Sequence, residues 1–348
     1  MKSFTEGLIE KEPITQELLQ TIRLIGEYKG KQDLYKVQSP QVLETLRQVA
    51  VVQSTESSNR IEGIIVSADR IKKLMQERTT PRDRSEQEIA GYRQVLDTIH
   101  ASHAQIRFTP NIILQLHQDL YQFTPISGGR WKTADNEIRE TRPDGTKFVR
   151  FQPVAAYATQ NAMEQLHQEF NSLRDSGKVE PLLLIPCYVL DFLCIHPFLD
   201  GNGRMARLIT LLLLYQAGYE VGRFISLERI IEKTKESYYD TLLQSSQNWH
   251  QAKHSLFPWW EYFLGVVVLG AYREFEQRVG TISSTKGTKK AMVLDVIESL
   301  PQQFAIAELQ EQCPTVSIDH IRRILRKERI EGRLECLGRG ADARWQKK

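Results

Sequence analysis

The sequence predicts a mostly α-helical protein with one β-hairpin and a small C-terminal α+β domain. Apolar residues recur at helical spacing through most of the 348 residues, for example at Leu18, Ile22 and Ile25. Before residue 281 one segment has clear hairpin character, because Pro143-Asp144-Gly145 is a strong turn between two β-type runs. After residue 281, three helical segments precede two short strand segments. This order of elements predicts a helical core with a smaller domain appended to it.

Composition indicates an ordinary globular protein. Apolar residues make up 41% and charged residues 26% of the chain, and the net charge is only +3. The first residues lack the apolar segment of a signal peptide, and the longest uncharged apolar run, Leu208–Tyr219, is too short to span a bilayer. The four cysteines show no CxxC spacing and are typical of reduced thiols. We therefore expect a cytoplasmic protein with no membrane partner, divided into residues 1–84, 85–280 and 281–348.

Apolar spacing and turn signals place the individual elements. Lys29–Asp33 is expected to end the first helix, and Arg78–Arg84 is typical of a connector before a helix capped by Ser85–Glu88. The hairpin strands are expected at Asn136–Thr141 and Lys147–Phe151. The helices expected up to residue 264 cover Thr15–Tyr28, Pro40–Gly63, Ser85–His100, Pro110–Tyr121, Pro153–Leu173, Leu182–Ile195 and Leu208–Tyr219, with two more around Tyr238–Tyr239 and from Phe257.

One twelve-residue stretch, His196–Arg207, concentrates chemically active residue types. Its turn, Gly201-Asn202-Gly203, precedes a buried helix and would present several backbone N–H groups to one point, which favours an anion. Arg204 and Arg207 share a face in the first turn of that helix, where each cation is disfavoured by a few tenths to ~1 kcal/mol. Two arginines in this place therefore indicate a bound anion, and a polyphosphate suits both the turn and the guanidinium groups.

Two further residues of the stretch complete a candidate reaction centre. Asp200 offers the oxygen ligand that Mg²⁺ prefers when it binds phosphates. His196 carries the side chain whose ordinary pKa lies nearest neutrality, so it is the natural general base.

The whole stretch resembles the signature HPFxxGNGRxxR of the Fic (Fido) family, which transfers AMP from ATP to a hydroxyl side chain of a protein. The resemblance implies that His196 takes the proton of the target hydroxyl and that Asp200 ligates Mg²⁺ between the α- and β-phosphates. It also implies that Gly201–Gly203 cradle phosphate while Arg204 and Arg207 bind the β- and γ-phosphates. The phosphotransferase branch of the superfamily carries Lys at the place of Gly203, so the resemblance favours AMP transfer.

The same resemblance implies a role for Glu62. Taken alone, it is either a solvated residue at the negative end of a helix or one paired with a cation. Ser58, Glu62 and Gly63 resemble the family's inhibitory motif [S/T]xxxE[G/N], which implies that Glu62 pairs with Arg207 and denies the γ-phosphate its site. ATP would then bind with its α-phosphate misaligned, and an error of about 1 Å costs on the order of 10²-fold in rate.

Two other parts of the helical core take a role from the resemblance. The hairpin corresponds to the family's flap, which holds the target by strand addition. Tyr238 and Tyr239 either border the adenine or belong to the core.

The C-terminal segment differs from the rest in charge. Residues 281–348 carry 13 Lys+Arg and 9 Asp+Glu, and their helix–helix–helix–hairpin order resembles a winged-helix domain. The expected third helix is basic and would be either a DNA-recognition helix or a solvated face of a protein-interaction or dimer module. The linker, the three helices and the turn between the strands are expected at Thr281–Thr288, Lys289–Ser299, Ala305–Gln312, Ser317–Glu331 and Gly338–Gly340, and the basic residues are Arg322, Arg323, Arg326, Lys327 and Arg329.

These patterns together predict a protein adenylyltransferase that uses ATP and Mg²⁺, restrained by Glu62, and modifies a Ser, Thr or Tyr of another protein or of itself. Two alternatives stay open. One is a nucleotide-responsive DNA-binding regulator, and the other is an enzyme of the same family that mainly removes AMP. A homodimer is compatible with either.

Overall fold

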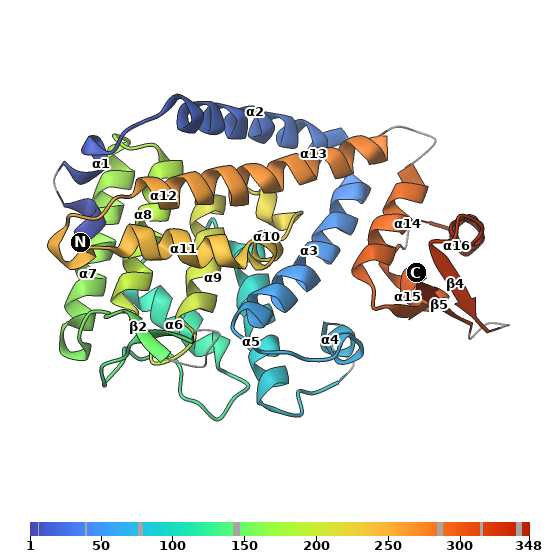
Figure 1. Cartoon of the computed structure of the whole chain (residues 1–348), viewed down its shortest axis with the longest axis horizontal. Helices are drawn as coiled ribbons and strands as arrows, with labels where there is room; N and C mark the ends of the chain where they lie inside the picture. Colours follow the sequence, from blue (N-terminus) through green and yellow to red (C-terminus); the bar gives the residue numbers. More distant parts are fainter. Residues whose placement is uncertain are drawn as a thin grey trace.

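The computed structural model is built almost entirely of helices, with one small domain at the C-terminal end (Figure 1). It describes residues 1–5, 7–38, 40–75, 79–141, 147–283, 288–313, 316–338 and 343–348. The expected fold class is confirmed. In the part of the chain so described, no helix combines the length and the apolar character needed to cross a membrane.

Two apolar helices, α8 (Pro181–Ile195) and α9 (Asn202–Gln216), form the centre of the core. Almost all of their side chains are buried, because α8 is apolar on almost every face, α9 is apolar from Leu208 to Leu214 apart from Thr210, and both are covered by other helices. The covering helices are α5 (Arg84–Ser102), α6 (Pro110–Leu120), α7 (Ala156–Ser176), α10 (Leu227–Lys233), α11 (Lys235–Ser246) and α12 (Phe257–Trp260). The loop between α8 and α9 therefore leaves and re-enters the buried centre of the core.

The N-terminal helices are more numerous than predicted, and the first predicted helix is longer. Short η1 (Lys2–Phe4) and α1 (Leu8–Lys11) are followed by α2, which runs unbroken over Gln16–Gln38, so the predicted break at Lys29–Asp33 is wrong. Glycine inside a helix costs only about 1 kcal/mol relative to alanine. Packing outweighs that cost, because Tyr28 stacks on Tyr272 with 6.3 Å between ring centroids and Tyr35 packs edge-on against Phe275 at 6.0 Å.

Helix α3 (Pro40–Ile61) ends as the sequence predicts. Gly63 takes a positive φ of 80°, and the amide of Ile64 donates to the carbonyl of Asn59, which is the bond of a Schellman cap. Helix α4 (Ala68–Met75) follows and packs on α5. The cap of α5 is Asp83 rather than the predicted Ser85, since the Asp83 carboxylate accepts from the amide of Glu86 at 2.9 Å.

The hairpin is confirmed as β1 (Ile138–Thr141) paired antiparallel with β2 (Lys147–Phe151). Its predicted turn, residues 142–146, lies outside the described residues. Figure 1 shows β2 at the same end of the molecule as the loop that joins α8 to α9.

The core ends in one long helical stretch. Helix α12 continues into a π-helical segment, Glu261–Val268, and then into α13 (Leu269–Ser283). Helix α14 begins at Thr288, so the segment joining core and C-terminal domain is shorter than the predicted linker at Thr281–Thr288. The residues between, 284–287, lie outside the described residues.

The C-terminal domain has its own apolar core, which includes Phe304, Leu325 and Trp345. Its elements are α14 (Thr288–Ser299), β3 (Gln303–Ala305), α15 (Ile306–Gln312), α16 (Ile318–Ile330), β4 (Leu334–Leu337) and β5 (Arg344–Lys347). The sheet order is β3-β5-β4, antiparallel throughout, which adds a strand that the sequence pattern did not predict. Three helices and a small sheet in this order are consistent with the winged-helix arrangement.

Candidate active site

His196 is held in a conformation that few non-glycine residues adopt. It ends α8 with φ 50° and ψ 61°, in the left-handed region. Its Nδ1 lies 3.2 Å from the Leu193 carbonyl, which can only accept, so Nδ1 carries the proton and Nε2 keeps a lone pair. Burial lowers the pKa of His196 to about 4, so the imidazole is neutral near pH 7. A neutral ring with a free Nε2 is the form that a general base needs.

The glycine-rich turn lies directly beside this histidine and opens α9. Gly201 is the N-cap with φ 83°, a conformation that favours glycine. The Asn202 side chain fixes the turn from inside, since its amide oxygen accepts from the amide of Phe198 at 2.9 Å and its Nδ2 donates to the Phe198 carbonyl at 2.8 Å. The backbone N–H groups that begin α9 are thereby held in place next to His196, as an anion site requires.

The Arg204 side chain is buried and is bound to other residues of the protein. Its side chain is 1% exposed, and its guanidinium lies 2.6 Å from the Glu88 carboxylate and 2.8 Å from the Tyr121 hydroxyl. Its contact with Asp200 is longer, at 3.8 Å. The structure therefore ties this predicted phosphate ligand to α5 and α6, beneath the turn.

Arg207 meets the inhibitory residues predicted from the sequence. Its Nε donates to Ser58 Oγ at 2.8 Å, and its second guanidinium nitrogen donates to the Ser58 carbonyl at 2.9 Å and to Glu62 at 2.7 Å. Burial disfavours the charged guanidinium, but the Glu62 carboxylate, together with Tyr238 and Tyr92, outweighs this and the pKa of Arg207 is raised. The end of α3 and the start of α9 are thus joined by a charged cluster.

The Glu62 carboxylate also lies against the helix start. A Cβ placed on Gly203 would be only 2.2 Å from Glu62 Oε1, so a side chain at residue 203 and this position of Glu62 exclude each other. An anionic oxygen beside the first turn of a helix is favoured by the N–H groups there. Glu62 therefore occupies space at the predicted anion site.

Tyr238 and Tyr239, at the start of α11, lie in the same region. Tyr238 is buried and packs edge-on against Trp259 with 5.8 Å between ring centroids. Burial raises its pKa, and the nearby Arg207 charge opposes that rise. Tyr239 lies under the Arg150 guanidinium at 5.7 Å, and Arg150 also donates to the Tyr239 carbonyl. Strand β2 is thereby fastened to α11 beside the Arg207 cluster.

Asp200 is the acidic side chain best placed for a metal ion. It is 55% exposed, and its Oδ1 accepts from the amide of Gly201 at 2.7 Å, while Oδ2 lies 3.2 Å from Arg84. Among the described residues no cluster of three His, Cys, Asp or Glu could cage a metal by itself. One accessible carboxylate fits Mg²⁺ that is held mainly by substrate phosphates, which is how this ion is usually bound.

The sequence patterns missed three residues that support the site. His117 Nε2 donates to the Asp200 carbonyl at 3.1 Å, because its Nδ1 already accepts from the amide of Gly129 at 3.0 Å. Lys132 and Asn136 contact the backbone of the His196 loop. His117 could have been suspected from its place on the apolar face of α6, but no local signal marked Lys132 or Asn136.

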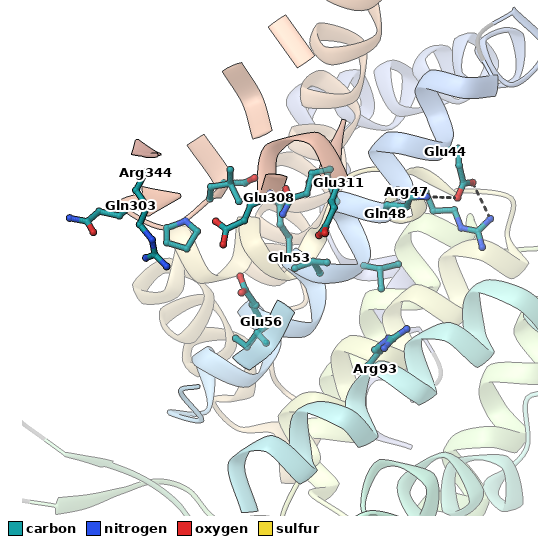
Figure 2. A pocket seen from close by; sticks show the side chains of 18 residues that line it. Glu44, Arg47, Gln48, Gln53, Glu56, Arg93, Gln303, Glu308, Glu311 and Arg344 are labelled. Atoms are coloured by element: carbon teal, nitrogen blue, oxygen red, sulfur yellow. Dashed lines mark hydrogen bonds and ion pairs between the residues drawn. The ribbon is translucent and has the colours of Figure 1, made fainter. Parts of the chain in front are cut away.

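A separate cleft of about 670 Å³ lies between α3 and the C-terminal domain. Figure 2 shows side chains of α3 and of the C-terminal domain around one space, among them Gln53 and Glu56 from α3 and Glu308 and Glu311 from α15. The cleft contains neither His196 nor any residue of the α9 turn, so it is not the reaction centre.

Comparison with known proteins places part of this chain in one family. Residues 107–214 match the family described as Fic/DOC family. Proteins named protein adenylyltransferase Fic from Drosophila persimilis and Drosophila pseudoobscura pseudoobscura are each 27% identical over 226 residues, covering 62% of this chain and 42% of each relative. The chain thus spans less than half the length of these curated relatives.

Solved structures show the same fold. A Fic family protein from Desulfovibrio desulfuricans G20 superposes with a TM-score of 0.62 at 19% identity, covering 97% of both chains. Fic-1 (residues 134–508) from C. elegans gives a TM-score of 0.60 at 18% identity, covering 77% of this chain and 73% of that one. The first match extends over the C-terminal domain as well as the core.

Proposed function

Since this chain contains a Fic/DOC domain, we propose that it transfers AMP from ATP to a hydroxyl side chain of a protein. The observation that supports this most directly is the neutral His196, whose Nε2 keeps its lone pair and which stands five residues before Gly201, the N-cap of α9. A base and an anion site in one loop suit attack by a hydroxyl on a nucleotide phosphate.

The proposed reaction is an in-line displacement at the α-phosphorus. The target oxygen bonds to this phosphorus as its proton passes to His196 Nε2. The bond from phosphorus to the oxygen bridging to the β-phosphate breaks, and pyrophosphate leaves with that electron pair. Most of the rate would come from positioning and electrostatic stabilisation, as in other phosphoryl transfers.

The remaining residues would bind and orient the nucleotide. The backbone N–H groups of Gly201, Asn202 and Gly203 would meet phosphate oxygens, and Arg207 would pair with the terminal phosphate. Arg204 would act through its contacts with Glu88 and Tyr121, which hold the turn. Asp200 would hold Mg²⁺, which would neutralise charge on the phosphates. Tyr239, which is partly exposed, would border the nucleotide from α11, whereas Tyr238 is buried and would support it from the core.

We also propose that Glu62 restrains this activity. Its carboxylate is hydrogen-bonded to Arg207 and lies against Gly203, so it competes for the groups that a γ-phosphate would use. The carboxylate is 32% exposed, which leaves a path for its displacement.

Labelled ATP tests the proposed reaction. The protein is incubated with Mg²⁺ and ATP labelled at the α- or the γ-phosphate, with and without cell lysate. Protein labelled from α-ATP alone supports AMP transfer. Label from γ-ATP alone would instead indicate phosphotransfer. Release of AMP from pre-modified protein, without any labelling, would favour AMP removal.

A second candidate function, DNA binding, is supported by the exposed face of α16. All five basic residues of this helix are exposed, while Ile321, Ile324 and Leu325 face the core of the domain. The acidic Asp319 and Glu331 are near Arg322 and Lys327, but Arg323, Arg326 and Arg329 have no ion pair among the described residues. Such a helix could contact phosphates in a DNA groove.

Fluorescence anisotropy with duplex DNA at several salt concentrations tests this second candidate. Arg323→Glu/Arg326→Glu/Arg329→Glu should abolish binding, and the control Lys11→Glu/Lys178→Glu/Lys253→Glu makes the same change in charge on exposed lysines of the core. If three phosphate contacts are made, the slope of log K against log salt contains about −2.7 from them. Equal losses in both variants would argue against a DNA-binding helix.

A further inference from the structure

The loop that carries His196 has almost every backbone carbonyl held by a side chain or amide from elsewhere in the chain. Lys132 Nζ donates to the Ile195 carbonyl at 3.0 Å, and the amide of Lys132 donates to the Pro197 carbonyl at 2.8 Å. Asn136 Nδ2 donates to the carbonyls of His196 at 3.3 Å and Phe198 at 2.9 Å. We call Lys132 and Asn136 the loop clamp.

Lys132 is an unusual residue for such a place. It is 3% exposed and forms no ion pair among the described residues; its Nζ donates to the Asn136 side-chain oxygen at 2.8 Å as well as to Ile195. Lysine is rarely so buried without a charged partner. Burial lowers its pKa to about 8, and the Asp135 charge opposes this. Burying the Lys132 ammonium without an ion pair is unfavourable for folding, so its presence here indicates a functional role rather than a stabilising one.

The backbone conformation of His196 indicates what this role is. A non-glycine residue at positive φ costs of order 1–3 kcal/mol and persists only where its surroundings fix it. The loop clamp donates hydrogen bonds to the carbonyls of residues 195 to 198, so it fixes the backbone on both sides of His196. Positional errors of about 1 Å in a reacting group cost on the order of 10²-fold in rate.

We propose that Lys132 and Asn136 are positioning residues for AMP transfer, holding His196 in the left-handed conformation from which its Nε2 reaches the target hydroxyl. This inference rests on the proposed function. In this proposal the segment before β1, which contains Lys132 and Asn136, orients the general base His196.

The Lys132 charge has a second effect on the same histidine. Charged groups face His196 from three places: Lys132 from the clamp, Glu62 from the end of α3 and Asp200 from its own loop. Lys132 lowers the pKa of His196, while Glu62 and Asp200 raise it. Removing the lysine charge should therefore raise this pKa and move the acid limb of the pH–rate profile to higher pH.

The test uses full-length protein in a Glu62→Gly background, so that restraint by Glu62 does not mask the effect. Lys132→Met should lower kcat for AMP transfer by 10- to 100-fold and raise the apparent pKa of the acid limb, with the Kd for ATP changed less than threefold. Lys132→Arg keeps the charge and the donors, so it should recover most of the activity and the parent pH profile. Asn136→Ala should lower kcat without moving the acid limb.

The matched control is Lys29→Met. Lys29 Nζ also donates to a backbone carbonyl, that of Ala217 at 3.2 Å, but at the opposite end of α9. It should match the parent in kcat. If Glu62→Gly itself transfers no AMP, the proposed function fails. If it transfers AMP and both clamp variants match it in kcat and pH profile, the clamp inference is overturned. A Lys132→Met protein that loses kcat only in proportion to its folded fraction, as measured by circular dichroism, also overturns it.

Discussion

Glu62 accepts a 2.7 Å hydrogen bond from Arg207, across 145 residues of sequence, and this contact joins the end of α3 to the start of α9. Each residue is at the end of a helix where its charge is disfavoured when alone. Together they neutralise each other, and Ser58 completes the cluster. The ion pair therefore explains how a glutamate at the C-terminal end of α3 and an arginine in the first turns of α9 can both be accommodated.

Glu62→Gly should raise the rate of AMP transfer by about 10- to 100-fold, because it frees Arg207 and the space beside Gly203. Transfer of label from α-ATP gives the rate. The control is Glu232→Gly, which removes a carboxylate that pairs with Arg60 on the surface. A rate equal to that of wild type would contradict the restraining role of Glu62.

Ser58→Ala should give an intermediate rate. Arg207 loses one of its two contacts with Ser58 but keeps the Ser58 carbonyl and Glu62. A hydrogen bond to a charged group contributes about 1.5–3 kcal/mol, so the Glu62–Arg207 arrangement is weakened rather than abolished. In the same assay the rate should lie between those of wild type and Glu62→Gly. A rate below that of wild type would show that Ser58 supports catalysis instead.

His196→Ala in the Glu62→Gly background should lower AMP transfer by at least about 10²- to 10⁴-fold, the usual contribution of a general base. ATP binding, measured by isothermal titration calorimetry, should persist because the α9 turn is intact. His320→Ala, in the C-terminal domain, is the control. Activity retained without His196 would remove it from the role of base.

Glu88→Gln should lower the free energy of unfolding by about 3–5 kcal/mol, since it leaves the Arg204 charge buried with its main partner gone. Denaturant unfolding measures this. The control Glu232→Gln breaks an exposed pair with Arg60 and should cost less than about 1 kcal/mol. Equal effects of the two changes would mean that the Arg204–Glu88 pair contributes no more than a surface pair.

Stability should fall as the pH drops from about 6.5 to 4. Burial lowers the pKa of five histidines: His100 to about 3, and His117, His167, His196 and His254 to about 4. In that window the unfolded chain binds protons that the folded chain does not, and each histidine contributes at most about 1.4 kcal/mol per pH unit. Asp191 and Glu56 act in the opposite sense, because burial raises the pKa of Asp191 to about 6 and also raises that of Glu56, but they are two groups against five.

Thermal denaturation at intervals from pH 8 to pH 4.5 checks this expectation. The melting temperature should be nearly constant above pH 7 and decline below pH 6.5. A melting temperature that rises as the pH falls through this window would show that the histidines are not buried in the neutral form.

Much of the fold follows from local patterns in the sequence. Apolar spacing located α8 and α9, and Pro-Asp-Gly located the hairpin, because these signals act within a few residues. The continuity of α2 was missed, since it depends on the packing of Tyr28 against Tyr272, more than 200 residues away. Strand β3 was missed for a similar reason: its three residues pair with β5 at the far end of the domain.

The site was predictable to the extent that it lies in one stretch of sequence. The turn, the base and the arginines are contiguous, and Ser58 and Glu62 formed a second short motif. The partners of Arg204 were not predictable, because Glu88 and Tyr121 reach it from α5 and α6 through tertiary packing. The clamp was missed because a lysine and an asparagine in a loop are ordinary until their acceptors are known.

The close approach of Glu62 to Gly203 has a consequence for how this protein can change over evolutionary time. Because a Cβ at residue 203 would be 2.2 Å from Glu62 Oε1, any larger residue there forces the carboxylate away from its contact with Arg207. The order of substitutions then matters: a change at residue 203 releases the restraint at once, whereas the loss of Glu62 opens room for residue 203 to vary later. Positions 62 and 203 are therefore expected to be epistatic. A lineage that loses Glu62 also loses this steric reason to conserve Gly203.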